Sequence, residues 1–220
     1  MPRGLAKEAG MKRIGRLHVL TDVVLQSRFS HAELARQAIT GGADTIQFRH
    51  KGGSTRWMIG TACEIREICR SAGVCFIVND RMDVAMASDA DGVHLGQDDF
   101  PIPLAREILG KNRIIGGSAA TPEEALQCQA EGADYIGFGP VYATASKEDA
   151  GPVSGIQVLR RVVQSLSLPV VAIGGVQGAN IPEIVSAGAW GVAVISAVCC
   201  RESPEGATRE LWQILLSRCS

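Results

Sequence analysis

The sequence has no long apolar run and no excess of charge of one sign. None of its hydrophobic stretches approaches the roughly 18 residues that a membrane-spanning helix needs. The formal net charge is −1 and the isoelectric point is about 6.4, so charge does not indicate binding to nucleic acid or to a membrane surface. The basic segment 1–16 also lacks the apolar core of a signal peptide. We therefore expect a cytoplasmic protein whose partners are small molecules.

Motifs for disulfides, zinc and covalent catalysis are missing as well. Seven cysteines are scattered through apolar segments without a CxxC pair, which is typical of free thiols in a reducing compartment. The first predicted strand-to-helix turn, residues 21–30, has no GxGxxG fingerprint of dinucleotide-binding sheets. No Ser-His-Asp or Cys-His arrangement follows from loop position. We expect His18, His31 and His94 to be hydrogen-bonded interior residues.

What the sequence does contain is a regular alternation of strand and helix patterns. Eight apolar runs are short and unbroken, as expected for parallel strands that are buried on both faces. Amphipathic stretches separate them, and three of these begin with a cap residue three positions before a Glu, at residues 30–33, 121–124 and 180–183. The predicted strands are Leu17–Thr21, Asp44–Phe48, Cys75–Val78, Gly92–Leu95, Arg113–Gly116, Tyr135–Phe138, Val170–Ile173 and Gly191–Ile195.

An internal repeat supports this count of strands. Similar triplets at residues 42–44, 89–91, 132–134 and 188–190 precede every second predicted strand. Eight βα units in about 200 residues predict an α/β protein with a single-domain (β/α)8 TIM barrel. We place the barrel at residues 14–220 and a flexible tail at 1–13, with Met11 as a second candidate start. A doubly wound open sheet is the alternative fold.

The stretch 75–99 organises the predicted site. Its two strands must be parallel, so the polar residues after each strand emerge at the same edge of the sheet. Asp80 follows the first of these strands and Asp99 the second, and carboxylate oxygens are the ligands that Mg²⁺ prefers. The sequence therefore predicts a metal site at Asp80 and Asp99. The alternative for Asp80 is that it only caps the following helix.

Two further groups of residues follow strands at the same end of the barrel. Arg49 and Lys51, with Gln47, are expected to face the mouth by strand alternation, and this pair of cations suits a polyphosphate. Gly174-Gly175 and Ser196 follow the seventh and eighth strands, where many barrels hold a phosphate. The residues thus predict two anion sites for two phosphorylated substrates, one of them a pyrophosphate. Alternatively, the glycine pair serves only its turn, and residues 144–147 form a solvated loop.

The chain resembles the thiamin phosphate synthase (thiamin-phosphate pyrophosphorylase) family from about residue 17 to about residue 200. The matching motifs are QFRHK (47–51), VNDRMDVA (78–85), DGVHLGQDD (91–99), IIGGS (114–118), GADYIGFGPVYATASK (132–147), PVVAIGG (169–175) and GVAVIS (191–196). The resemblance implies a (β/α)8 transferase that condenses 4-amino-2-methyl-5-hydroxymethylpyrimidine pyrophosphate with a thiazole phosphate. The products implied are thiamin phosphate and pyrophosphate, and the reaction requires Mg²⁺.

The resemblance also implies roles for individual residues. The pyrimidine would leave as a carbocation that the thiazole nitrogen captures, while Arg49, Lys51 and Lys147 stabilise the departing pyrophosphate together with Mg²⁺. No protein nucleophile is needed. Asp80 and Asp99 would hold Mg²⁺. The substrate-binding residues would be Gln47, Arg49, Lys51, Asn79, Ser118, Thr144, Ser146, Lys147, Gly175, Ile195 and Ser196.

The chain departs from the family pattern at four positions. His50 stands where an acidic residue is usual, Ser146 where Thr is usual, and Gly117 and Ala120 where a larger residue and a His are more frequent. The alternatives are a related tautomerase acting on the thiazole phosphate and a non-catalytic regulatory barrel that binds phosphate. Related tautomerases often carry a His at the place of Ala120 and have lost much of the Asp and cation set, whereas this chain keeps that set and lacks the His, which favours the synthase. The oligomeric state is left open, and a homo-oligomer is compatible with the sequence.

Overall fold

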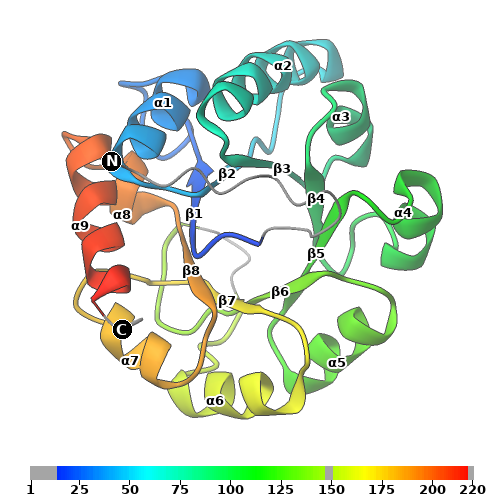
Figure 1. Ribbon diagram of the computed structural model, residues 1–220, viewed down its shortest axis with the longest axis vertical. Coiled ribbons are helices and arrows are strands. Elements are labelled where there is room, and N and C mark those ends of the chain that lie inside the picture. The colour runs from blue at the N-terminus through cyan, green and yellow to red at the C-terminus, as the bar shows by residue number, and fades with distance from the viewer. Residues whose placement is uncertain (1–13, 147–150, 218–220) are drawn as a thin grey trace.

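The protein folds into a closed barrel of eight parallel strands surrounded by helices (Figure 1), seen in a computed structural model that describes residues 14–146 and 151–217. Each strand pairs with the next in sequence, and β8 pairs with β1. The strands are β1 (Leu17–Thr21), β2 (Thr45–Phe48), β3 (Cys75–Asn79), β4 (Gly92–Leu95), β5 (Ile114–Ala119), β6 (Tyr135–Phe138), β7 (Val170–Ala172) and β8 (Gly191–Val194). This closure confirms the predicted TIM barrel and excludes the open-sheet alternative.

The helices lie outside the ring of strands. They are α1 (His31–Gly41), α2 (Thr55–Ala72), α3 (Met82–Ala87), α4 (Ile102–Leu109), α5 (Pro122–Ala130), α6 (Ile156–Ser165), α7 (Ile181–Ser186), α8 (Ser196–Cys199) and α9 (Pro204–Leu216). Helix α9 packs against α1. In the described ranges, no helix is long and apolar enough to cross a membrane. The tail proposed at residues 1–13 lies outside the described residues.

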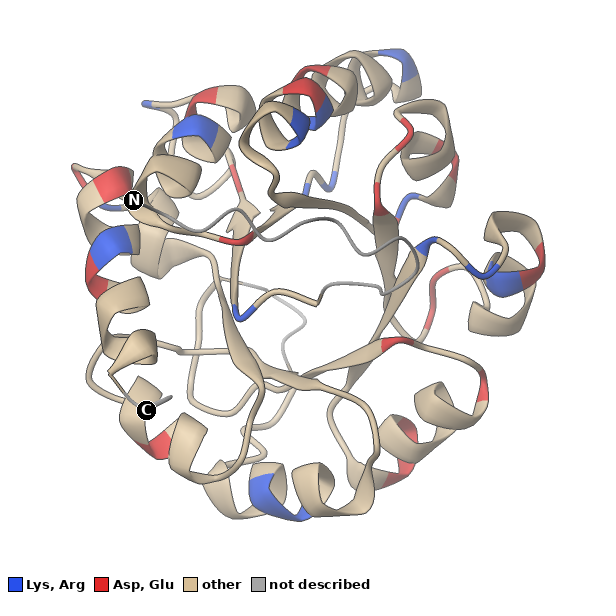
Figure 2. Cartoon of the chain, in the orientation of Figure 1, with Lys and Arg blue, Asp and Glu red and all other residues tan. Residues whose placement is uncertain are grey.

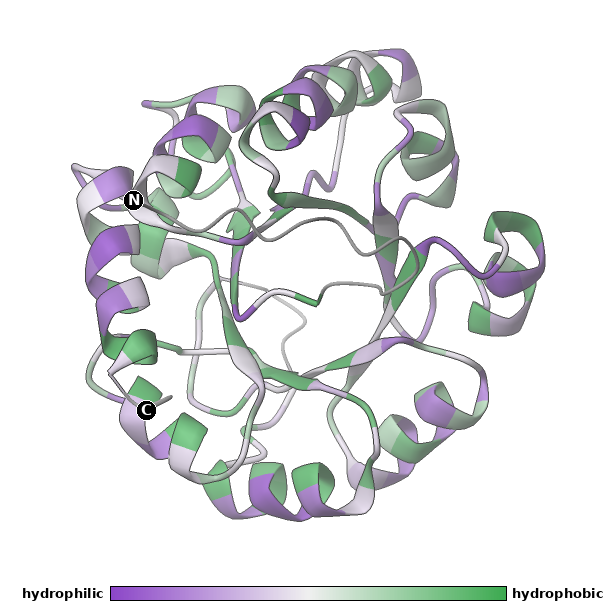
Figure 3. Ribbon diagram, viewed as in Figure 1, coloured by the Kyte–Doolittle hydropathy of each residue, from purple (hydrophilic) through white to green (hydrophobic). Residues whose placement is uncertain are grey.

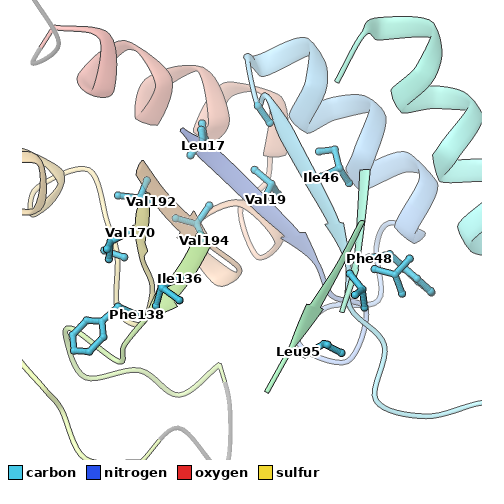
Figure 4. Packing of buried hydrophobic residues seen from close by; sticks show 14 of the residues in the cluster. Leu17, Val19, Ile46, Phe48, Leu95, Ile136, Phe138, Val170, Val192 and Val194 are labelled. Atoms are coloured by element: carbon cyan, nitrogen blue, oxygen red, sulfur yellow. The ribbon is translucent and has the colours of Figure 1, made fainter. Parts of the chain in front are cut away.

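Side chains alternate along each strand between two apolar layers. One set, such as Leu17 and Val19 of β1, packs against the surrounding helices and forms the larger core (Figure 4). The other set, such as Leu20 and Ile77, points into the barrel and forms a smaller inner cluster. The eight strands carry no Lys, Arg, Asp or Glu, and charge gathers on the helices and loops instead (Figure 2). Hydropathy follows the same division, with apolar strands inside mixed, amphipathic helices (Figure 3).

The repeated triplets have a structural role at the amino-terminal end of the barrel. Asp44, just before β2, accepts hydrogen bonds from the backbone N–H groups of Arg16 and Leu17 where β1 begins, each at 2.9 Å. Asp91 and Asp134, before β4 and β6, do the same for the starts of β3 and β5. Three of the four triplets therefore join an even strand to the preceding odd strand, and they satisfy amides that would otherwise be buried without a partner. The triplet before β8 ends in Trp190 and has no carboxylate.

Two of the three predicted helix starts use their cap side chain. Ser30 and Glu33 form a complete capping box at the start of α1. Thr121 caps α5, but Glu124 accepts its hydrogen bond from Ala120 N–H rather than from Thr121. The prediction at Asn180 was wrong, because its side chain makes no cap bond to α7. It bonds to the backbone of the preceding loop instead, at Gly175 and Gln177.

Candidate active site

A cavity of about 290 Å³ opens at the carboxyl ends of the strands. Inward-pointing strand residues form its floor, and the loops after the strands form its walls. Eight of the predicted substrate-binding residues line it: Gln47, Asn79, Ser118, Thr144, Ser146, Gly175, Ile195 and Ser196. Lys147, predicted to contact the pyrophosphate, lies outside the described residues. One cavity therefore joins residues that follow or end six different strands of the barrel.

One end of the cavity carries a chain of hydrogen bonds that includes Ser118. The strand β5 is longer than predicted, so Ser118 lies on the strand and points inward rather than standing in a turn. Its hydroxyl lies 2.9 Å from Nε2 of His94, and Nδ1 of His94 lies 2.9 Å from the hydroxyl of Tyr135. Gly116 makes room for this pair, because a Cβ there would collide with both rings. This confirms the expectation that His94 is a hydrogen-bonded interior residue.

Gln47 and Asn79 lie beside this chain, and both are buried. The side-chain carbonyl oxygen of Gln47 is buried and has no hydrogen-bond partner within the described protein. A buried polar atom without a partner is costly, so one that lines a cavity indicates a ligand that supplies the partner. The oxygen of Gln47 requires a donor, such as an amino group.

The predicted metal ligands lie just beyond Asn79, where β3 and β4 end. Lys51 donates a hydrogen bond of 2.7 Å to Oδ2 of Asp80. Asp80 has a left-handed backbone (φ 63°), and Arg81, not Asp80, occupies the cap position of α3. The capping alternative for Asp80 is therefore wrong. A non-glycine residue in this conformation is held there by its surroundings, which is frequent at functional sites.

The carboxyl groups of Asp80 and Asp99 lie close enough to influence each other's protonation. Burial would raise the pKa of Asp80, but the hydrogen bond from Lys51 and the neighbouring Asp99 carboxyl group bring that pKa below its usual value. Burial and the neighbouring Asp80 charge raise the pKa of Asp99, against a hydrogen bond from Gly96 N–H. Two carboxylates that cannot both ionise freely are a suitable site for a divalent cation.

The donor set at this pair fits Mg²⁺. Within residues 14–146 and 151–217, no group of three or more His, Cys, Asp or Glu side chains converges as a metal cage. Mg²⁺ is usually held by one or two carboxylates and completes its shell with water and substrate phosphates. Asp80 and Asp99 supply two such carboxylates, so the pair suits this ion better than a metal that needs a full set of protein ligands.

The side chain of Arg49 does not face the cavity in the way that strand alternation predicted. The strand β2 ends at Phe48, so the alternation does not extend to the loop residues 49 and 51. Gln47 lines the cavity and Lys51 reaches Asp80, but the Arg49 guanidinium is buried and forms an ion pair with the equally buried Asp22. Lys51 is therefore the more open of the two predicted cations, and Arg49 is the more firmly held.

The opposite end of the cavity consists of hydroxyl groups and backbone. The hydroxyl of Ser146 donates a hydrogen bond of 3.0 Å to the hydroxyl of Ser196, at the start of α8. The Ser146 N–H bonds to the Thr144 hydroxyl, and both residues line the cavity, while Ala143 and Ala145 of the same loop are exposed. Gly175 has φ 62°, and a Cβ there would lie 2.5 Å from the carbonyl oxygen of Ala143. The glycine therefore does more than serve its own turn.

Two departures from the family pattern have physical explanations. A Cβ on Gly117 would lie 2.8 Å from the sulfur of Cys128, so the cysteine of α5 fills the space of the missing side chain. His50 is not among the residues that line the cavity, and its ring centroid lies 4.5 Å from that of Trp57. Its Nδ1 lies 3.1 Å from Nε2 of His31. Neither departure removes a polar group from the cavity.

Several residues of this site were not predicted from the sequence. Asp22 directly follows the first predicted strand, and the rule that site residues follow strands would have identified it. His18, Gln97 and Tyr135 also line the cavity. Burial lowers the pKa of His18 and raises that of Tyr135, so both are neutral lining groups near neutral pH. The strand positions of His18 and Tyr135 have the inward parity, which only the register of the barrel reveals.

Comparisons with proteins of known sequence all indicate the same protein family. Residues 17–198 match the protein family described as thiamine monophosphate synthase. The chain is 54% identical to the thiamine-phosphate synthase of Methanocella arvoryzae over 199 residues, which cover 90% of this chain and 94% of that relative. It is 51% identical to the thiamine-phosphate synthase of Salinibacter ruber over 197 residues, which cover 90% of this chain and 87% of the other.

Solved structures show the same relationship. The thiamine phosphate pyrophosphorylase of Pyrococcus furiosus superposes with a TM-score of 0.86 at 43% identity, covering 93% of this chain and 97% of that one. A 3-hexulose-6-phosphate synthase superposes with a TM-score of 0.66 at 19% identity, covering 91% and 99%, and shows only a shared fold.

Proposed function

The chain belongs to the thiamine monophosphate synthase family, and we propose that it joins a hydroxymethylpyrimidine pyrophosphate to a thiazole phosphate in the cavity described above. The chain is a transferase of the thiamine-phosphate synthase type. The specific substrates, the Mg²⁺ requirement and the role of each residue are our proposal. The synthase assignment is favoured over a tautomerase or a non-catalytic barrel.

The observation that carries the proposal is that one cavity has two chemically different ends. Near β2 to β5 it carries an unpartnered amide oxygen and hydroxyl groups, next to a carboxylate pair and a lysine. Near β7 and β8 it offers small hydroxyl groups and glycine backbone. The first end suits an aminopyrimidine with a metal-bound pyrophosphate, and the second suits a phosphate monoester.

At the first end, Gln47 accepts a hydrogen bond from the pyrimidine amino group, and Asn79 and Ser118 hold the ring. Arg49 and Lys51 donate to the pyrophosphate, and Lys147 joins them. Charge accumulates on the pyrophosphate as its bond to the pyrimidine methylene breaks, and fixed cations stabilise that charge more in the transition state than in the ground state. Since no nucleophile of the protein is required, the absence of a catalytic triad is consistent with this chemistry.

Asp80 and Asp99 would hold Mg²⁺. When bound, the ion supplies further charge neutralisation for the leaving pyrophosphate. Lys51 contacts Asp80 directly, so this lysine helps to orient the carboxylate as well as to meet the anion. Burial and the neighbouring Asp80 raise the pKa of Asp99, and a divalent cation bound at the pair would favour the ionised form of both carboxylates.

At the second end, Ser146 and Ser196 bind the thiazole phosphate with Thr144 and the backbone of Gly175 and Ile195. In the proposed reaction the thiazole nitrogen faces the pyrimidine and captures the carbocation. Holding both reactants in one cavity replaces an encounter in solution with a positioned reaction. We place this reaction in the cytoplasm, because all six described cysteines are free.

Steady-state kinetics of two variants tests the two-ended site. We expect Asn79→Ala to raise KM for the pyrimidine substrate and to leave KM for the thiazole phosphate near the wild-type value. We expect Ser196→Ala to do the reverse. The changes should be on the order of tenfold each, as for the loss of one hydrogen bond to a charged or buried group. A single variant that shifts both constants equally would contradict the assignment of separate ends.

A further inference from the structure

Asp22 is a buried carboxylate that joins two segments of the barrel mouth. It directly follows β1, and its side chain is 2% exposed. Oδ2 of Asp22 accepts a hydrogen bond from Nη1 of Arg49, in the loop after β2. Oδ1 accepts from the backbone N–H groups of Val24 at 2.8 Å and Leu25 at 3.0 Å. One carboxylate therefore fixes the Arg49 guanidinium and the start of the β1–α1 segment together.

We propose that Asp22 is a positioning residue that holds the Arg49 guanidinium in place for the pyrophosphate. The inference rests on the proposed function, because it takes pyrophosphate as the anion that Arg49 meets. Neither Asp22 nor Arg49 is among the residues that line the cavity, and Asp22 makes no contact with substrate in the proposed reaction. Its effect on the reaction is transmitted through Arg49.

Burial of the pair supports a positioning role. Both side chains are less than a tenth exposed, and a buried ion pair contributes little stability compared with apolar packing of the same volume. The pair also lies at the catalytic end of the barrel, away from the amino-terminal end where Asp44, Asp91 and Asp134 join the strands. Stability alone does not explain why this location carries a buried charge pair.

Arg49 also retains unused hydrogen-bonding capacity. Its Nε is buried and has no partner among the described residues. A guanidinium whose Nη1 is fixed by a carboxylate keeps its remaining donors in a defined plane, and this planar fork matches phosphate oxygens. Since Asp22 balances the charge of Arg49, the arginine acts as a directed donor, while Lys51 and the metal supply most of the net positive charge.

The surrounding segment provides a matched control. Gln26 orders residues 22–29 independently of the ion pair. Its Nε2 donates hydrogen bonds to the backbone carbonyl oxygens of Asp22 and Phe29. Its Oε1 accepts a hydrogen bond from the Arg28 N–H. The side chain of Gln26 does not touch Arg49 or the Asp22 carboxylate. Gln26→Ala therefore loosens the segment without removing the partner of the guanidinium.

The test is calorimetric titration of inorganic pyrophosphate with Mg²⁺ into the full-length wild type and variants. We expect Asp22→Asn to weaken binding at least about tenfold and Gln26→Ala to leave it unchanged. We expect the double variant Asp22→Asn/Arg49→Gln to bind no more weakly than Arg49→Gln alone, because both changes remove the same interaction. In turnover, Asp22→Asn should raise KM for the pyrimidine substrate but not for the thiazole phosphate.

Binding by Asp22→Asn at the wild-type level, or strictly additive losses in the double variant, would overturn the positioning role. If Asp22→Asn does not fold, Asp22→Glu is used, which keeps the charge and changes the reach. We expect it to bind pyrophosphate more weakly than wild type but to retain the ion pair, and unchanged affinity would also overturn the role. Failure of the wild type to bind pyrophosphate with Mg²⁺ would instead count against the proposed function itself.

Discussion

Lys51 Nζ lies 2.7 Å from Oδ2 of Asp80, whose carboxyl group in turn interacts electrostatically with that of Asp99. This contact joins the loop after β2 to the loop after β3, so the cation proposed for pyrophosphate and the ligand proposed for the metal are positioned together. A change at either side chain should therefore disturb both the metal and the anion.

The first prediction concerns the carboxylate pair. Asp99→Asn should lower Mg²⁺-dependent turnover by about a thousandfold, equivalent to about 4 kcal/mol in the barrier, because one of two metal ligands is lost. The fold should survive, since Asp99 is partly exposed and lies in a loop. Steady-state kinetics over a range of Mg²⁺ concentrations measures the effect.

The neighbouring Asp98 is the matched control for this change. It is exposed, and no contact of its carboxylate is part of the site. Asp98→Asn removes the same formal charge from the same loop and should leave turnover within about twofold of wild type, as expected for surface substitutions. Equal losses in the two variants would show that general charge, not metal ligation, is responsible.

The second prediction concerns the backbone at the phosphate end. Gly175→Ala introduces a Cβ at positive φ that would meet the carbonyl oxygen of Ala143, so the loop after β7 must shift. We expect KM for the thiazole phosphate to rise and the free energy of unfolding to fall by about 1–3 kcal/mol. Kinetics and chemical denaturation of the same preparation measure both. Unchanged KM for the thiazole phosphate would remove Gly175 from the site.

The third prediction concerns Gly60, a glycine that has no positive φ and no neighbour that a side chain would meet. Gly60 lies in α2, and a Cβ there would have nothing within 4 Å. Gly60→Ala should raise the free energy of unfolding by roughly 0.5–1 kcal/mol, because alanine loses less backbone entropy in a helix. Urea denaturation measures this gain, and turnover should stay at the wild-type level. A loss of stability would mean that α2 packs differently there.

The fourth prediction concerns pH. Burial, followed by the neighbouring His50, lowers the pKa of His31 from 6.5 to about 4, against an opposing effect of Asp22. Above pH 6.5 His31 is neutral in the folded and unfolded chains and contributes no pH dependence. As the pH falls from 6.5 to 4, the unfolded chain gains a proton that the folded chain resists, and stability drops by up to about 3 kcal/mol.

Urea denaturation between pH 7 and pH 4 measures this loss. His31→Asn should flatten the dependence of the free energy of unfolding on pH over that interval, whatever its effect on stability at pH 7. Some slope should remain, because the pKa values of His18 and His50 are lowered too. An unchanged slope in the variant would contradict the assignment of the proton to His31.

Most of the architecture could be predicted because each strand is a short apolar run. Runs such as Gly92–Leu95 and Tyr135–Phe138 have the predicted bounds in the structure. The end of β5 could not be predicted in this way, since its last four residues, Gly116 to Ala119, are small and give no strongly apolar pattern. Pairing with β4 and β6 keeps these residues in the sheet and turns Ser118 inward.

Site residues could be predicted where they lie at or just after the end of a strand. They were harder to predict where a contact between distant segments sets the position of the side chain. Gln47, Asn79 and Ser196 line the cavity as expected. The partner of Arg49 could not be read from the motif QFRHK, because Asp22 comes from another loop. The failed cap at Asn180 has the same origin, since the nearby backbone of Gly175 competes successfully for its side chain.

Pyrophosphate release by the purified full-length protein tests the central claim most directly. The protein is mixed with hydroxymethylpyrimidine pyrophosphate and thiazole phosphate, with and without Mg²⁺, and each substrate is also supplied alone. The two-ended site predicts rapid release only when both substrates and Mg²⁺ are present. Absence of release from folded protein that binds the thiazole phosphate, or release that does not depend on Mg²⁺, would contradict the account.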